Sequence, residues 1–238
     1  MVNEFGGPRQ RIEPTPEQLI EAFTTQDNSA PQVFHPRPQS FEELAQLDPQ
    51  TANAIMCAAN LPYLLNSGYV IPPTAFLVGG VGAAVLAAEN DGTHSVYRTH
   101  HDVDFLVLED MLPAHNYALS PFGGIRQIAK NIYRSKVSST WGLPASVFNK
   151  VGSLRPEVQV DLFAYHRKGN KGIFSGGSYD LFEFTLYDLF PEEEAHMQLK
   201  ICNLYGYDYY IREDIVRKMK TLDAKSRQKG QVDLAHIS

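Results

Sequence analysis

The chain of 238 residues has little of what marks disulfide-rich, metal-thiolate or nucleic-acid-coating proteins. Its two cysteines, Cys57 and Cys202, are far apart and form no CxxC spacing. This spacing argues against a disulfide framework and excludes a cysteine-rich metal site, and we expect both thiols to be buried in the core. Basic residues are also scarce, with 21 Lys and Arg against 27 Asp and Glu and a formal net charge of -6. This balance argues against a broad electrostatic surface for nucleic acid.

Long apolar runs are absent as well. The longest, over residues 75–88, contains glycines and is shorter than the roughly 20 residues that a membrane-spanning helix needs. Residues 1–14 contain no apolar stretch of the kind that secretory signals carry. We therefore expect no membrane association and a cytoplasmic location. The chain is 43% hydrophobic and 20% charged, which is typical of a globular domain with its own core.

Helix starts and turns divide the chain into a partly helical N-terminal extension over residues 1–50 and a main domain over residues 51–238. A capping residue followed three positions later by Glu or Gln predicts a helix start. The starts are expected at Thr15, Ser40 and Asp48-Pro49, with a linker over residues 26–39 and a helix end at Ser67-Gly68.

In the main domain, apolar runs of strand length alternate with segments of helical spacing, which predicts an α+β fold with a short mixed sheet flanked by helices. Strands are expected over residues 75–78, 103–108 and 158–163, with a weaker one over residues 146–148. Helices are expected over residues 81–89, within residues 120–135 on the spacing of Ile125, Ile128, Ala129 and Ile132, and from Ile215 through Leu222. Residues 168–180 predict a loop and residues 198–211 a hairpin.

Gly79 and Gly80 lie between the first predicted strand and the helix that follows it. The start of a helix presents free backbone N–H groups and a positive dipole end. Glycine lets a phosphate approach such a chain closely. The pair is therefore a candidate phosphate site, and a purely structural turn is the alternative.

Three aspartates accompany the predicted strands. Asp102 and Asp104 lead into an apolar run, and the alternation of a strand places both carboxylates on one face. Two such carboxylates repel each other unless a cation lies between them, and their oxygens suit Mg²⁺. Asp161 is a single acid in an apolar strand, where an unpaired carboxylate is costly to bury. If the two strands are neighbours, Asp161 completes a three-carboxylate cluster. Solvated acids at Asp102 and Asp104, and a structural bond from Asp161 to Arg or backbone groups, are the alternatives.

The order of Gly-Gly, Asp-x-Asp on a strand and a single later Asp resembles the DNA polymerase β-like nucleotidyltransferase superfamily. The run Arg98-Thr99-His100-His101-Asp102-Val103-Asp104 is similar to its small-molecule branch, which includes aminoglycoside 2″- and lincosamide nucleotidyltransferases. Toxins of abortive-infection systems are related enzymes. The C-terminal residues Lys218 or Lys220, Arg227-Gln228-Lys229 and Asp233-Leu234 are similar to the family's closing motif, although Gly230 interrupts its Lys-Asp pair. The resemblance covers roughly residues 60–238.

The resemblance implies a nucleotidyltransferase fold and a Mg²⁺-dependent enzyme that moves a nucleoside monophosphate from an NTP, such as ATP, to a hydroxyl acceptor, releasing pyrophosphate. Asp102, Asp104 and Asp161 would hold two Mg²⁺ ions, with Asp161 also accepting the acceptor's proton. Gly79, Gly80, Arg98 and Lys220 would bind the nucleotide.

Several points stay open at this level. Arg98 could instead form a salt bridge to Asp102 or Asp104, and Lys220 could lie on a solvated helix face. The acceptor could be a small molecule such as an antibiotic, or a macromolecule such as RNA or protein, and the acidic balance favours a small or basic one. The alternative function is a catalytically inactive nucleotide-binding or interaction protein that kept the fold.

Overall fold

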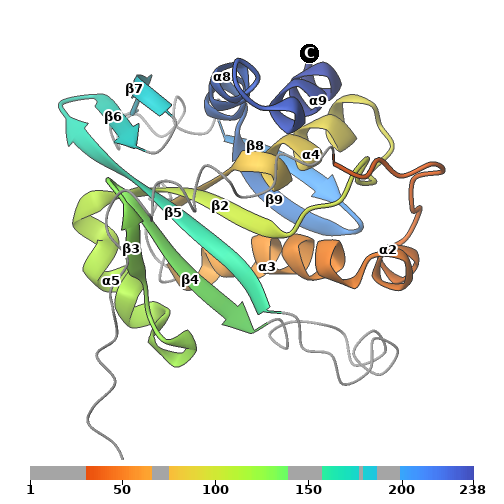
Figure 1. The fold of residues 1–238 in the computed structure, drawn as a ribbon, viewed down its shortest axis with the longest axis horizontal. Coiled ribbons are helices and arrows are strands. Elements are labelled where there is room, and N and C mark those ends of the chain that lie inside the picture. The colour runs from red at the N-terminus through yellow and green to blue at the C-terminus, as the bar shows by residue number, and fades with distance from the viewer. Residues whose placement is uncertain (1–30, 66–74, 139–156, 177–178, 187–198) are drawn as a thin grey trace, which may run out of the picture.

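The computed structural model describes residues 31–65, 75–138, 157–176, 179–186 and 199–238. In these residues the fold is α+β, with a mixed seven-stranded sheet flanked by helices and a separate two-stranded sheet (Figure 1). The helices are α2 (Phe41–Leu47), α3 (Pro49–Leu65), α4 (Gly79–Asn90), α5 (Leu112–Ala118), α8 (Glu213–Asp223) and α9 (Gln228–Ile237), with short 3-10 turns η1 (Glu109–Met111) and η2 (Ser120–Phe122). The strands are β1 (Ala75–Val78), β2 (Asp102–Leu108), β3 (Arg126–Ala129), β4 (Ile132–Ser138), β5 (Glu157–Lys168), β6 (Lys171–Gly176), β7 (Tyr179–Thr185), β8 (Leu199–Leu204) and β9 (Tyr207–Arg212).

The large sheet has the strand order β1-β2-β5-β4-β3, and β6 and β7 extend it from the far end of β5. Strands β2 and β5 run parallel, whereas the other pairs are antiparallel. A parallel pair needs a long crossover, and the chain makes one through α5, β3 and β4. The middle of the sheet is therefore assembled from segments far apart in sequence.

The sheet separates two apolar cores. Along β2, Val103, Phe105 and Val107 point into the larger core, to which α3 and α4 also contribute. Leu106 points the other way, into a smaller core that includes Met219 of α8. Helices α8 and α9 lie beside α4 (Figure 1). Helix α3 packs into the same larger core as α4 and α9. None of the described helices combines the length and the hydrophobicity that a membrane span requires.

Most of the predicted elements are confirmed. The Ser40 hydroxyl caps α2 by accepting the Glu43 N–H at 3.1 Å. Strands β1, β2 and β5, the helix after Gly79, the β8–β9 hairpin and the C-terminal helix all form where they were expected. Cys57 and Cys202 are buried and free, as predicted. The expected boundary at residue 50 falls inside α3, and Phe34, from the described part of the extension, joins the larger core. The helix start at Thr15, the helix end at Ser67-Gly68 and the strand at 146–148 lie outside the described residues.

The helix predicted within residues 120–135 is wrong. Its residues form η2 and the β3–β4 hairpin instead. The helical spacing misled because Ile128 and Ile132 both enter the smaller core, but from two paired strands rather than one helix face. The connection between the strands is Lys130-Asn131, and Asn131 has a φ of 58°, which Asn tolerates better than most residues.

The loop predicted over residues 168–180 is also wrong, since most of it forms β6 and the start of β7. The glycines of this segment suggested a loop, yet Gly172 lies within a strand and allows the Phe184 ring to pack against the backbone. A Cβ atom at Gly172 would lie 2.3 Å from the Phe184 ring, so the missing side chain leaves room for an aromatic from β7.

Candidate active site

The three aspartates of the predicted site lie on adjacent strands. The parallel register of β2 and β5 sets Asp104 opposite Asp161 and Asp102 opposite Gln159. Paired residues on neighbouring strands lie about 4.8 Å apart and point to the same face. Asp102 is two residues from Asp104 and shares that face. The structure therefore confirms that the two strands are neighbours, and the three carboxylates gather on one face of the sheet.

The turn between β1 and α4 lies against these acids. Val78, the last residue of β1, pairs with Asp104, and Gly79 follows with a φ of 67°. A Cβ atom at Gly79 would lie 1.8 Å from Asp104 Oδ2. Only glycine leaves this space and adopts this φ without strain, so the start of α4 and the Asp104 carboxylate are immediate neighbours.

Arg98 and His100 face the first turn of α4. A Cβ atom at Gly80 would lie 2.8 Å from Arg98 Nη2 and 3.1 Å from His100 Nδ1. Both side chains are buried, and within the described part of the chain His100 Nε2 has no hydrogen-bond partner. Burial and then the charge of Arg98 hold the pKa of His100 well below its usual value. The turn is thus faced by a fixed guanidinium and a neutral imidazole.

Asp233 of α9 collects three side chains from distant parts of the chain. It accepts hydrogen bonds from Arg98 Nε at 2.6 Å, from Arg98 Nη2 at 2.9 Å and from the Tyr97 hydroxyl at 2.7 Å. Lys220 Nζ lies 2.8 Å from Asp233 Oδ2, the oxygen that also accepts from Arg98 Nη2. Burial alone would raise the pKa of Asp233, but the charges of Lys220 and Arg98 more than reverse this and leave it below the usual value.

Arg98 and Lys220, the cations expected to bind nucleotide, are therefore held by one carboxylate. The salt bridge of Arg98 is made with Asp233 rather than with Asp102 or Asp104, so that alternative is wrong. Lys220 is 4% exposed, so the alternative of a solvated helix face is wrong too. Whether the two cations bind a nucleotide stays a prediction.

The acids experience unequal surroundings. Partial burial, then the negative charges of Asp102 and Asp161, raise the pKa of Asp104 well above its usual value, although Lys220 and Arg227 oppose the rise. Among the described residues, no hydrogen bond or ion pair is made by the carboxylate of Asp102 or Asp104. Burial also raises the pKa of Asp161, against the opposing effect of Arg134. A cation placed among these groups would relieve the repulsion.

Arg134 is a residue of this site that the sequence prediction did not name, although its alternative for Asp161, a carboxylate bonded to Arg, is the contact that the structure shows. It lies on β4 directly opposite Asp161, and its Nε and Nη2 donate to the two carboxylate oxygens at 2.8 and 2.9 Å. The prediction placed this segment near a helix, which hid the register. Asn131 in a two-residue connection is the signal that indicates the hairpin.

Two of the three carboxylates, those of Asp102 and Asp104, suit a magnesium ion. In the part of the chain that the structure describes, no group of three or more His, Cys, Asp or Glu side chains is arranged to hold a metal ion. This fits the geometry, since both Asp161 oxygens already accept from Arg134. Mg²⁺ commonly uses one or two carboxylates and completes its shell with water and phosphate oxygens, and Asp102 and Asp104 are such a pair.

Comparison of the chain with protein-family models found no match, and a search of the curated proteins found none either.

Proposed function

We propose that this protein is a Mg²⁺-dependent nucleotidyltransferase that moves a nucleoside monophosphate from an NTP to a hydroxyl acceptor and releases pyrophosphate. One observation carries the proposal. The register of β2 and β5 sets Asp104 beside Asp161, while Gly79 brings the start of α4 against the same carboxylate. An acidic group next to a helix N-terminus offers both a cation site and a phosphate site.

The phosphate side of this proposed site is built from positive groups. The backbone N–H groups at the start of α4 carry the positive end of the helix dipole. Arg98 contacts the turn at Gly80, and Lys220 interacts electrostatically with Asp104. Asp233 holds both cations, so they would meet the triphosphate without first losing side-chain freedom.

Asp102 and Asp104 would hold a magnesium ion, which when bound neutralises the phosphate oxygens and the leaving pyrophosphate. The raised pKa of Asp104 supports this role, because a nearby cation restores the charged form. Asp161 would take the proton of the acceptor hydroxyl. Burial raises its pKa, and a higher pKa makes a carboxylate a stronger base.

The proposed reaction is a single displacement. The acceptor oxygen forms a bond to the α-phosphorus, and the bond between that phosphorus and the oxygen bridging to the β-phosphate breaks. The proton passes to Asp161, and pyrophosphate leaves. The acceptor would be a small hydroxyl compound or a macromolecule, and the net charge of -6 favours a small or basic one.

The test is release of pyrophosphate from each of the four NTPs with Mg²⁺ and a panel of acceptors that includes amino-hydroxyl antibiotics, RNA and the protein itself. We expect Asp104→Asn and Asp161→Asn each to lower the rate by about 10³-fold or more, which is about 4 kcal/mol of transition-state stabilisation. The matched control is Asp208→Asn, which changes an exposed acid whose bond is to Asn203, and it should leave the rate within about twofold.

Full activity of the Asp104→Asn protein would contradict the proposal. Mg²⁺-dependent binding of an NTP without release of pyrophosphate across the whole panel would favour the alternative, a nucleotide-binding protein without catalysis.

A further inference from the structure

Arg134 and Asp161 form a pair that the sheet itself imposes. The antiparallel register of β4 and β5 places the two residues directly opposite each other, so their side chains share a face. The guanidinium donates from Nε to Oδ1 at 2.8 Å and from Nη2 to Oδ2 at 2.9 Å. The side chains are only 15% and 4% exposed, so water screens the pair weakly.

The pair belongs to a row of charges that crosses four strands. From β3 to β2 the paired positions are Arg126, Arg134, Asp161 and Asp104. The row therefore has two cations on one side and two acids on the other. Arg134 lies at the change of sign. Burial alone would lower its pKa, but the hydrogen bond to Asp161 and the charges of all three aspartates raise it.

Arg134 already occupies both carboxylate oxygens of Asp161, for which a second metal ion would have to compete. A guanidinium stays charged at every physiological pH and matches a carboxylate with two parallel hydrogen bonds. Arg126 adds a second positive charge behind it, directly across β3 and β4. An incoming divalent cation at Asp161 would meet both charges and would compete for oxygens that already accept from Arg134.

We infer that Arg134 is a positioning residue that takes the place of a second metal ion at Asp161, so that this site binds one divalent cation, at Asp102 and Asp104. The inference rests on the proposed function. The family resemblance of the sequence implies two metal ions, and the inference reduces this number to one. Arg134 orients the Asp161 carboxylate and balances its charge, while each oxygen keeps a further lone pair for the acceptor hydroxyl.

The experiment measures Mn²⁺, a paramagnetic substitute for Mg²⁺, on the full-length protein by electron paramagnetic resonance. One arm titrates Mn²⁺ alone, and the other adds an equal mixture of the four non-hydrolysable NTP analogues. Two Mn²⁺ ions bridged by carboxylates at about 3.5–4 Å give an exchange-coupled spectrum, whereas a single ion does not. We expect wild type to show one bound ion and no coupled spectrum in either arm.

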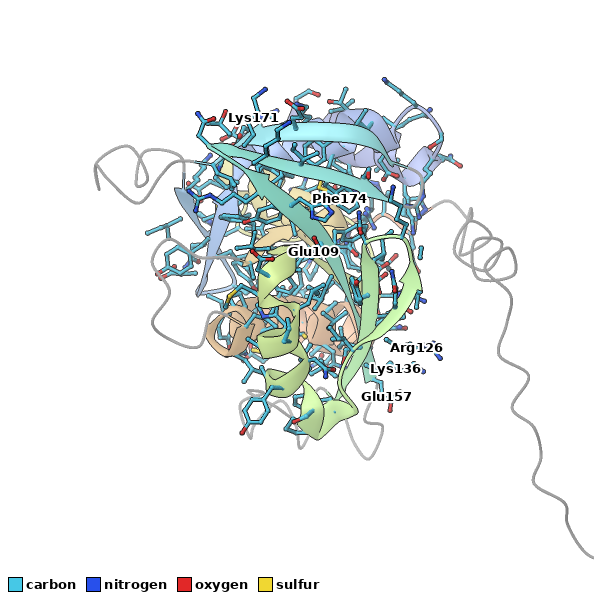
Figure 2. All side chains as sticks on the ribbon, turned by 90° about the vertical axis from the view of Figure 1, so that its left-hand side faces the viewer. Glu109, Arg126, Lys136, Glu157, Lys171 and Phe174 are labelled. Carbon is cyan, nitrogen blue, oxygen red and sulfur yellow. The ribbon has the colours of Figure 1, made fainter. Side chains whose placement is uncertain are left out.

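Arg134→Gln removes the charge and opens the space at Asp161. We expect it to bind a second ion, with a coupled spectrum and a dissociation constant for that ion at least roughly tenfold below the wild-type limit. Arg134→Lys keeps a charge there and should stay at one ion. The matched control is Lys136→Gln, on the same face of the same strand, whose exposed ion pair with Glu157 at 3.5 Å is at the outer end of the sheet (Figure 2). It removes a positive charge without touching Asp161 and should also stay at one ion.

A coupled spectrum from wild type overturns the inference, and so does a folded Arg134→Gln protein that still binds one ion. If Arg134→Gln does not fold, Asp161→Asn decides. It should keep one ion with its affinity within about threefold, since a ligand lost from the metal costs more than that, and a larger loss overturns the inference. Absence of any Mn²⁺ binding by wild type in both arms is a different result, because it removes the proposed function itself.

Discussion

Asp104 and Asp233 are two carboxylates near Lys220, and the protein treats them in opposite ways. Asp233 is fully buried, yet Arg98, Lys220 and Tyr97 satisfy it and its pKa is lowered. Asp104 lies among other acids, contacts the glycine turn and has a raised pKa. The first is a complete structural network, in which every charge has a partner. The second is an incomplete one, of the kind that a bound cation completes, and perturbed groups of this kind concentrate at functional sites.

The comparison predicts that the two acids respond in opposite directions to the same substitution. Asp233→Asn should lower the free energy of unfolding by about 3–5 kcal/mol, because it leaves the buried cations Arg98 and Lys220 without their counter-charge. Thermal unfolding followed by circular dichroism measures the loss. Adding Lys220→Met to that variant should restore part of the stability, since one unpaired charge is then removed.

The control for this substitution is Asp208→Asn, an exposed acid for which we expect a change within about 0.5 kcal/mol.

The pH dependence has a definite sign. The folded pKa of Asp233 lies below its unfolded value. The free energy of unfolding of wild type should therefore exceed that of Asp233→Asn by the full difference above about pH 4, and the difference should disappear only as the pH falls through the folded pKa. A small effect of Asp233→Asn at neutral pH would remove the distinction between the two acids.

Gly79→Ala tests whether the carboxylate of Asp104 is held in place against the glycine turn. Gly92 provides a matched control, since its φ of 66° is close to the 67° of Gly79 but a Cβ atom there meets nothing within 4 Å. Gly92→Ala therefore measures the backbone strain alone, about 1 kcal/mol. Gly79→Ala should cost about 1–3 kcal/mol more, because its Cβ would overlap Asp104 Oδ2. Urea unfolding of both variants gives the difference, and equal losses would show that the Asp104 carboxylate moves away freely.

The smallest expected effect is a gain in stability from Asp104→Asn without metal. The folded pKa of Asp104 is raised, so its contribution to stability falls as pH rises from the unfolded pKa of about 3.9 through the folded one. In EDTA at pH 7.5 the variant should melt roughly 3 °C above wild type, as for about 1 kcal/mol in a chain of this size. The gap should close toward pH 4 and on addition of Mg²⁺. A gap that widens on acidification would show that Asp104 is paired in the folded protein.

Local pattern in the sequence was enough for several parts of the site. Alternation along β2 puts Asp102 and Asp104 on one face, and the apolar run before Gly79 ends where α4 begins. The spacing of the C-terminal apolar residues likewise predicted α8, which carries Lys220. These features depend on neighbours within a few residues, so periodicity reveals them.

Pairing between distant segments was decided by the tertiary structure alone. Nothing local sets the register that aligns Asp161 with Asp104, or that aligns Arg134 with Asp161. The partners Arg98 and Asp233 are separated by 135 positions in the chain. Even the secondary structure around Ile128 depended on tertiary packing, because a helix and a pair of strands over this segment would bury the same apolar side chains. The sequence by itself determined which face of each element is apolar, and packing of the two cores determined which charges meet, since register follows from which faces can be buried together.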